Sequence, residues 1–213
     1  PEISSVTLGP MKFTHFHVHS QYSILDGAAS IPGLIDKALA DGMPALSLTD
    51  HGNMFGIKLF YDTCRKKGIK PILGCEAYVA RVSRFNKEKP IDRSGEHLII
   101  LAKNLKGYRN LVKLTSAAFV DGFYYRPRID KELLEKHHEG LIISSACLGG
   151  EIDQKIMAGD LEGAEKAAQW YKDLLGDDYY LEVMRHPTTD PKQRAEIYDN
   201  QELCIREKRK IAQ

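Results

Sequence analysis

Short apolar runs alternate with longer amphipathic stretches along almost the whole chain, and this alternation restricts the fold more than any other feature. The clearest runs are 97–102 and 140–145, which are apolar nearly throughout. Strands of that kind are buried on both faces, as in parallel sheets. Strand followed by helix, repeated several times, predicts an α/β protein whose parallel strands are joined by crossover helices.

Six strands are expected, so the favoured architecture, a barrel of seven or eight strands, would be incomplete in this sequence. Their expected ranges are 13–20, 45–49, 70–79, 97–102, 140–145 and 179–184. Helices are expected between them and at the end of the chain, over 31–41, 56–67, 105–120, 131–137, 151–158, 161–175 and 191–213. Ser30 and Asp130 can cap the helices 31–41 and 131–137, and Gly42 and Gly68 can end the helices 31–41 and 56–67. An open doubly wound sheet is the less favoured alternative, because no glycine-rich phosphate loop follows a strand.

Composition places few further limits on function. The 213 residues are 43% hydrophobic, enough for one domain with a core. With 30 basic and 29 acidic residues the net charge is +1, so nothing attracts nucleic acid to the chain as a whole. Four cysteines without a C-x-x-C pair predict a reduced, cytoplasmic protein. We expect no membrane span, and we expect residues 1–10 to be a leader before Met11 and not a signal peptide.

The first expected strand carries histidines at alternate positions. His17 and His19 share a face, and His15 lies on it too if the strand starts early enough. Two imidazoles at that spacing can hold one metal ion, and Asp26 in the following loop can add a carboxylate. The alternative is a half-buried strand whose histidines happen to alternate with apolar residues.

Other metal-binding side chains fall near the ends of the later strands. His51 follows the second strand, Glu76 lies in the third, His97 opens the fourth and Cys147 follows the fifth. Each alone also fits a simpler role: a turn histidine, an exposed strand end, a solvent-facing histidine and a small buried thiol. Strand ends meet on one face of an α/β barrel, so together these residues predict a transition-metal site. The mixed donors suit Zn²⁺ or Mn²⁺ better than Mg²⁺.

Five motifs resemble the PHP (polymerase and histidinol phosphatase) domain family. They are His17-Val18-His19-Ser20 with Asp26, Thr49-Asp50-His51-Gly52-Asn53, Gly74-Cys75-Glu76, Glu96-His97-Leu98, and Ser144-Ser145-Ala146-Cys147-Leu148-Gly149-Gly150-Glu151. The last motif and the run 125–130 are closer to the polymerase members, which stand at the N-terminus of bacterial DNA polymerase III alpha subunits. The resemblance covers 12–213.

The resemblance implies a distorted seven-stranded β/α barrel that holds up to three metal ions, Zn or Mn. The implied metal ligands are His17, His19, Asp26, His51, Glu76, His97 and Cys147. Of these, Asp26, His51 and His97 are the expected catalytic residues, and Asp50 is expected to orient its neighbours. The family also uses an Asp-x-His pair on its last strand. This sequence contains none, so we expect the domain, 11–213, to lack that strand at its C-terminal end.

The implied function belongs to DNA replication. As part of a DNA-directed DNA polymerase, the domain would hydrolyse phosphodiesters with the help of its metals, as a 3′–5′ exonuclease that proofreads the primer end. The implied partners are a DNA primer–template, the rest of the alpha subunit and other replisome subunits. Three alternatives remain: a non-catalytic module that docks or stabilises partners, a small-molecule phosphoesterase of the histidinol phosphatase type, and an amidohydrolase barrel, which also begins with His-x-His.

Two loops are further candidates for contacts with DNA. The polar stretch Arg81–Gly95 is expected to be a mobile surface loop whose basic residues either follow DNA phosphates or are simply solvated. The stretch 122–128 is basic and aromatic. Its Tyr124, Tyr125, Arg126 and Arg128 are expected either to stack on a strand end or to contact the polymerase body.

Overall fold

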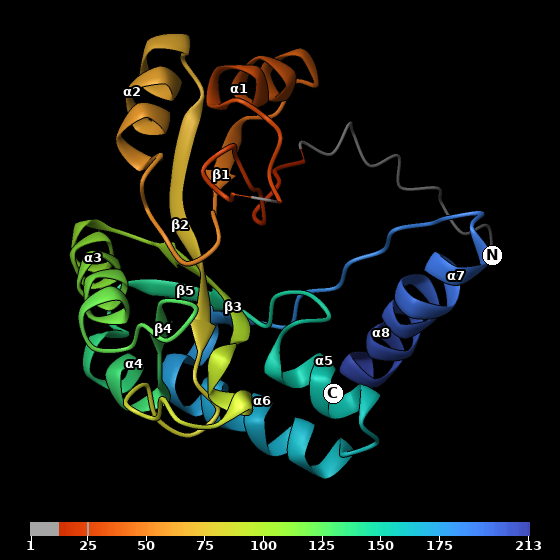
Figure 1. Cartoon of the computed structure of the whole chain (residues 1–213). Helices are drawn as coiled ribbons and strands as arrows, with labels where there is room; N and C mark the ends of the chain where they lie inside the picture. The colour runs from red at the N-terminus through yellow and green to blue at the C-terminus, as the bar shows by residue number, and fades with distance from the viewer. Residues whose placement is uncertain (1–12, 25) are drawn as a thin grey trace, which may run out of the picture.

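The fold is a mixed α/β arrangement around one twisted sheet (Figure 1). The computed structural model describes residues 13–24 and 26–213, so the expected leader at 1–10 lies outside the described residues. The strands are β1 (Ala45–Leu48), β2 (Lys70–Val79), β3 (Glu96–Ala102), β4 (Arg128–Ile129), β5 (Leu141–Ser144) and β6 (Tyr179–Tyr180). They run in the order β1-β2-β3-β5-β6, and β4 pairs with β2 beside this path.

The helices match the expected ranges closely. They are α1 (Ile31–Ala40), α2 (Ile57–Lys67), α3 (Leu105–Val120), α4 (Lys131–His137), α5 (Glu151–Met157), α6 (Leu161–Leu175), α7 (Pro191–Gln193) and α8 (Asp199–Ile211), with short turns η1 (Pro90–Arg93), η2 (Gly176–Asp178) and η3 (Arg194–Tyr198). Ser30 and Asp130 cap α1 and α4 by accepting backbone N–H bonds, as expected. Gly68 ends α2 in the left-handed conformation, with φ of 78°. Among the described residues, no helix is both long and apolar enough to cross a lipid bilayer.

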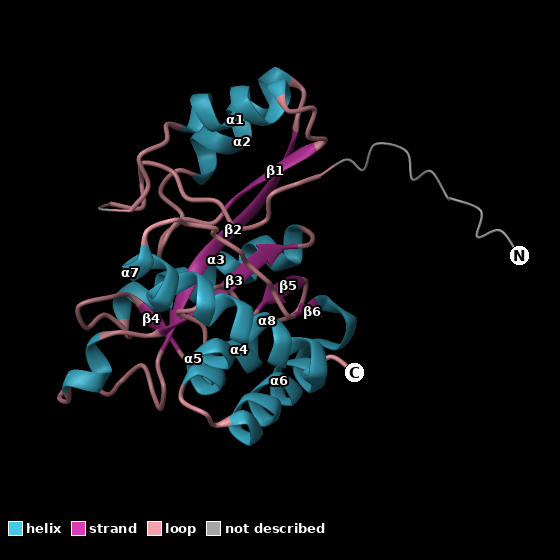
Figure 2. Ribbon diagram, turned by 90° about the vertical axis from the view of Figure 1, so that its right-hand side faces the viewer, coloured by secondary structure: helices cyan, strands magenta, loops and turns pink. Residues whose placement is uncertain are grey.

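The long strand β2 joins two lobes. Its first four residues pair with β1 in the lobe of α1 and α2, and residues 74–79 pair with β3 in the lobe of α3 and α4 (Figures 1 and 2). Gly74 lies where the partner changes. A Cβ there would lie 2.6 Å from Leu101 Cδ2 and 2.7 Å from the Ile100 carbonyl oxygen, so the crossing strands leave room only for glycine. Each lobe has its own apolar core, and α5, α6 and α8 enclose a third.

The prediction of an all-parallel sheet is wrong. β3 runs antiparallel to both β2 and β5, whereas β1–β2, β2–β4 and β5–β6 are parallel. A parallel neighbour needs a crossover connection, usually a helix, but an antiparallel neighbour does not. Residues 80–95 between β2 and β3 contain only the short turn η1, so the chain returns in the opposite direction.

The prediction of a strand over 13–20 is also wrong. Residues 13–20 run beside β1, and Ser47 N and Thr49 N donate to the carbonyls of His15 (3.2 Å) and Val18 (2.8 Å). The regular ladder is interrupted because the Thr49 hydroxyl takes the bond from Val18 N at 2.8 Å. The two-residue strand β4 was not expected and begins at the last residue of the expected loop 122–128, and β6 is shorter than expected.

The closed barrel of seven strands is not confirmed by the described residues. Their sheet is open, with β1 at one end of the path and β6 at the other. A cavity of about 910 Å³ is lined by residues from both ends, Ala45 and Tyr180, and by Ile72 and Ile142 between them. The sheet is therefore curved but unclosed across this cavity.

The loop Arg81–Gly95 is exposed at most of its described residues, as expected, but it is anchored near its start. Arg84 is buried, and its Nη1 lies 2.7 Å from Asp130 Oδ1. Arg84 N donates to the other oxygen of Asp130, and buried Arg128 donates to the carbonyls of Arg84 and Asn86. Arg84 and Arg128 therefore hold the loop against α4, and neither points to a ligand at the surface.

Candidate metal centre

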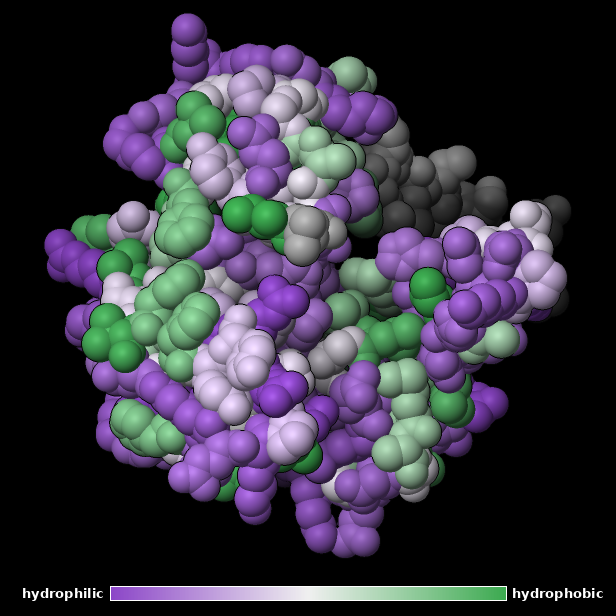
Figure 3. Space-filling view, viewed as in Figure 1, coloured by the Kyte–Doolittle hydropathy of each residue, from purple (hydrophilic) through white to green (hydrophobic). Residues whose placement is uncertain are grey.

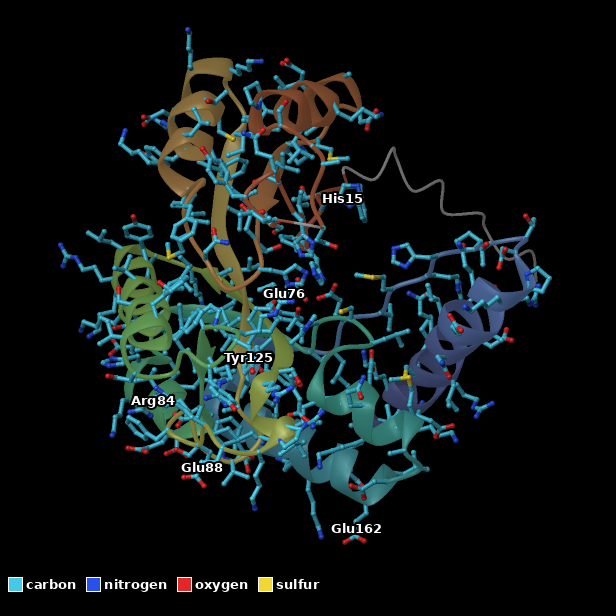
Figure 4. All side chains as sticks on the ribbon, viewed as in Figure 1. His15, Glu76, Arg84, Glu88, Tyr125 and Glu162 are labelled. Carbon is cyan, nitrogen blue, oxygen red and sulfur yellow. The ribbon has the colours of Figure 1, made fainter. Side chains whose placement is uncertain are left out.

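Glu76 lies at the centre of a cluster of histidines where the two lobes meet (Figure 4). Its side chain is fully buried in β2. Its Oε2 lies 3.0 Å from His17 Nε2 and 3.2 Å from His51 Nδ1, and it also contacts His19 Nε2. Its Oε1 lies 2.8 Å from His97 Nδ1. Four imidazoles from three separate segments thus converge on one carboxylate.

Backbone hydrogen bonds place these segments. Glu76 N donates to the Asp50 carbonyl at 3.1 Å, and Gly52 N donates to the Glu76 carbonyl at 2.8 Å, which fixes His51 opposite Glu76. His17 and His19 reach the same oxygen of Glu76, as the alternate spacing predicts even without a regular strand.

Asp26 lies at the solvent side of the cluster. Its side chain is 49% exposed, its Oδ2 contacts His19 Nδ1, and the same oxygen lies 3.5 Å from His51 Nε2. Asp50 holds the loop that carries it. The Asp50 carboxylate accepts bonds from Ser20 N (2.6 Å) and from the hydroxyls of Ser20 (2.8 Å) and Ser23 (2.9 Å). The expected orienting role of Asp50 therefore has a geometric basis.

Cys147 lies against His97 on the other side of Glu76. Its Sγ is 3.7 Å from His97 Nδ1 and 3.8 Å from Glu76 Oε1. The preceding Ala146 adopts a left-handed conformation (φ 56°), which turns the chain toward the cluster. A Cβ on Gly149 would lie 2.8 Å from the His97 ring, so this glycine allows the loop to pack directly on the imidazole. All seven expected metal ligands are thus brought together, whereas His15 instead packs against Phe13.

Glu182 belongs to the cluster and was missed from the sequence. Its Oε1 lies 2.8 Å from His17 Nδ1, and its Oε2 accepts a bond of 2.6 Å from the Ser144 hydroxyl. Lys208 of α8 donates to the Glu182 carbonyl at 2.7 Å. The sequence did hold a signal for Glu182. It is a glutamate within the expected strand 179–184, and several other cluster residues also lie near the ends of expected strands.

Tyr78, two residues after Glu76 on β2, supports the histidines from the side. Its ring stacks on His51 with centroids 5.7 Å apart and planes 12° apart, and it meets the His97 ring edge-on at 5.3 Å. Tyr78 is 6% exposed, so this ring is a fixed wall of the cluster.

The charges of the cluster favour protonated imidazoles when no metal is bound. Burial lowers the pKa of His17, but hydrogen bonds to Glu182 and Glu76 outweigh it and raise the pKa to about 10. Burial also lowers the pKa of His97, but hydrogen bonds to Cys147 and Glu76 outweigh this effect and raise the pKa to about 9. Burial of Glu76 is outweighed by its histidine bonds, which hold the pKa of its carboxyl far below the usual range. His51 differs, because burial lowers its pKa.

The donor set suits metal ions. Three groups of ligand atoms each lie within 4.8 Å of one another: His17, His19 and Glu76; His19, Asp26 and His51; His51, Glu76 and His97. The groups share members, which is the arrangement that neighbouring ions with bridging ligands require. His51 Nδ1 is buried near Glu76 and has no hydrogen-bond partner among the described residues, so this ring nitrogen is a candidate to bind a cation.

Comparison with known proteins gives the class of the chain. A match to the PHP domain covers residues 15–186, and the chain belongs to this family. It is similar to the DNA polymerase III subunit alpha of Borreliella burgdorferi, with 52% identity over 84% of this chain and 16% of that protein. It is also similar to the same subunit of Treponema pallidum (49% identity, 88% and 16%) and Thermus aquaticus (45%, 85% and 15%).

The chain therefore spans about one sixth of the length of these curated relatives. A solved structure described as a putative metal-dependent phosphoesterase, from Bifidobacterium adolescentis, covers 92% of this chain and 84% of that chain. It has 14% identity and a TM-score of 0.45, too low to support an argument about this chain.

Proposed function

We propose that this chain is the PHP domain of a replicative DNA polymerase alpha subunit and hydrolyses phosphodiesters with the help of bound metal ions. The reaction we propose is 3′–5′ exonucleolytic removal of a mispaired primer end. The observation that carries the proposal is the convergence of four imidazoles on the buried carboxylate of Glu76. Imidazole nitrogens grouped around one carboxylate, which lose their protons when a metal binds, are typical of a transition-metal centre.

The proposed metal ligands are the seven residues expected from the sequence. His17, His19, Asp26, His51, Glu76, His97 and Cys147 would hold up to three ions of Zn or Mn. Bound there, these ions would polarise phosphate oxygens and acidify a water. The resemblance also implies a seventh strand with an Asp-x-His pair, and the cavity between β1 and β6 offers the space for it.

The chain's own residues position the ligands and take up protons. Glu182 fixes the orientation of His17 through Nδ1, and Tyr78 fixes the plane of the His51 ring. Asp26 is half exposed and its Oδ2 lies 3.5 Å from His51 Nε2, so its carboxylate, oriented by His51, can accept the proton of the attacking water on the side open to solvent. His97 is the third proposed catalytic residue, held between Glu76 and Cys147.

The cellular setting we propose follows from the printed name of the relatives, DNA polymerase III subunit alpha. The domain would act on a DNA primer–template in the cytoplasm, as part of a DNA-directed DNA polymerase. Its partners would be the rest of that subunit and the other subunits of the replisome.

The function is tested with a labelled primer–template that carries a mispaired 3′ end, in the presence of Mn²⁺ or Zn²⁺. We expect the complete alpha subunit to shorten the primer, and an Asp26→Asn, His97→Ala variant of it to do so at least about tenfold more slowly. This chain alone should be much less active, because the resemblance implies an Asp-x-His pair that its sequence does not contain. Asp36→Asn on α1 is the matched control. Metal binding without cleavage would favour the non-catalytic module. Cleavage restricted to small phosphomonoesters would favour a phosphatase of the histidinol phosphatase type.

A further inference from the structure

Tyr125 forms an exposed aromatic point in a strained conformation. Its φ is 62°, in the left-handed region that L side chains rarely adopt, and Tyr124 N donates to the Arg126 carbonyl at 3.0 Å to close the turn around it. The Tyr125 side chain is nevertheless 60% exposed, so burial does not offset the strain. Strained residues of this kind cluster at ligand sites, so the conformation of Tyr125 indicates a role in binding.

One arginine lies over this ring, and the next residue along the chain, Arg126, lies over the ring of Tyr78. Arg93 Cζ lies 4.9 Å from the centroid of Tyr125, and Arg126 Cζ lies 5.5 Å from the centroid of Tyr78. Both arginines are exposed, and neither guanidinium forms an ion pair with a carboxylate among the described residues. They differ in this from Arg84 and Arg128, which are buried and hold the loops together. We call Arg93, Tyr125 and Arg126 the Tyr125 ridge.

The Tyr125 ridge adjoins the metal centre. Arg126 covers the ring of Tyr78, and the same ring contacts both His51 and His97. Figure 4 labels Tyr125 below and to the left of Glu76. The strand that follows the ridge, β4, pairs with the end of β2. Pro127 packs so close to Gly52 that a Cβ there would lie 2.7 Å from its Cγ.

We propose that the Tyr125 ridge binds the single-stranded end of a nucleic acid and directs it into the metal centre. A base would stack on the exposed face of Tyr125, and the guanidinium groups of Arg93 and Arg126 would bind flanking phosphates. Base stacking on an aromatic ring tolerates any sequence, which a primer end requires. This inference rests on the proposed function and specifies how its substrate is recognised.

The exposed rings of Phe55, Phe119 and Phe123 form another aromatic group, in which the rings pack on one another, whereas Tyr125 has the guanidinium group of Arg93 over its ring. Polar side chains cover most of the face in Figure 3, and apolar ones stand in small groups. A small phosphomonoester would need cations near the metals but no exposed aromatic ring beside them. The combination of ring and unpaired guanidinium groups therefore favours a nucleotide chain over a small phosphate ester.

The test compares a Tyr125→Gly, Arg126→Ala variant with the unaltered protein. Glycine adopts the left-handed conformation without strain, so this variant should fold. Tyr125→Phe keeps the ring, and Tyr61→Ala, Arg65→Ala removes an exposed tyrosine and arginine of α2 as a matched control. The first measurement is binding of a fluorescent single-stranded oligonucleotide, by anisotropy, without added metal. The second is Mn²⁺-dependent hydrolysis of bis(para-nitrophenyl) phosphate, which has no base and is too small to span the ridge.

We expect the ridge variant to bind the oligonucleotide about tenfold more weakly, while Tyr125→Phe and the α2 variant bind normally. Hydrolysis of the small ester should stay within about twofold in all of them. Normal oligonucleotide binding by the ridge variant, or none by the unaltered protein, would overturn the inference. If the ridge variant lost small-ester hydrolysis by the same factor as oligonucleotide binding, the inference would also be overturned, because the loop would then only support the metal centre. If no protein hydrolyses any ester but the ridge variant still binds the oligonucleotide more weakly, the proposed reaction is wrong and the inference about the Tyr125 ridge is supported.

Discussion

At the scale of the residue, Glu76 decides the properties of the cluster, since four imidazoles depend on its two oxygens. Replacing Glu76 by Gln keeps the size but removes the charge and turns one oxygen into a donor. We expect affinity for Zn²⁺ or Mn²⁺ to fall by about tenfold or more, measured by calorimetric titration. Glu132→Gln on the exposed face of α4 is the control and should bind as the unaltered protein does. Unchanged affinity in Glu76→Gln would remove Glu76 from the ligand set.

The raised pKa values of His17 and His97 make the metal-free protein sensitive to alkali. A group whose pKa is raised on folding stabilises the fold fully below its ordinary value of 6.5, and this stabilisation is lost as the pH rises through the folded value. With pKa values of about 10 and about 9, the thermal midpoint in a chelator should fall between pH 7 and pH 10.

The control for this pH dependence is a His17→Gln, His97→Gln variant, in which the fall should be smaller. Bound metal takes neutral imidazole, so added Zn²⁺ or Mn²⁺ should oppose the fall and bind more tightly as the pH rises. A thermal midpoint that is constant or rising over this range in the chelator would contradict the assignment.

At the scale of the element, a buried ion pair holds the loop 80–95 against α4. Asp130 caps α4 and accepts two bonds from Arg84, and both side chains are at least 90% buried. We expect Asp130→Ala to cost about 3–5 kcal/mol of unfolding free energy in urea, because it leaves a buried charge unpaired. Glu132→Ala, 3.9 Å from the same guanidinium but 58% exposed, should cost about 0–1 kcal/mol. Equal costs would show that the buried pair does not hold the loop.

Elements with local signals were predictable from the sequence, and those set by distant contacts were not. The caps at Ser30 and Asp130 and the stop at Gly68 lie in the sequence itself, so α1, α2 and α4 begin and end near the expected residues. The direction of β3 depends on the connection 80–95, and polar composition alone did not show that this connection would return as a hairpin. The irregular pairing of 13–20 depends on one side-chain bond, from Val18 N to Thr49.

At the scale of the whole molecule, the two lobes meet at the cluster, and the candidate site depends on their junction. The seven expected ligands could be named because their residue types bind metals, because most lie near the ends of expected strands, and because the resemblance to the PHP domain implies all of them; the structure brings them together. Glu182 could not be ranked above other acidic residues, because its contact with His17 spans 165 positions. The burial of Arg84 could not be predicted either, because its partner, Asp130, is distant in the sequence.

The central claim is that this cluster binds metal, and elemental analysis of the purified protein tests it most directly. The comparison is between the unaltered chain and a His17→Ala, His19→Ala variant, with His137→Ala, His138→Ala at the end of α4 as the control. We predict bound Zn or Mn in the unaltered and control proteins and a large loss in the His17, His19 variant. Equal metal content in all three proteins would contradict the account.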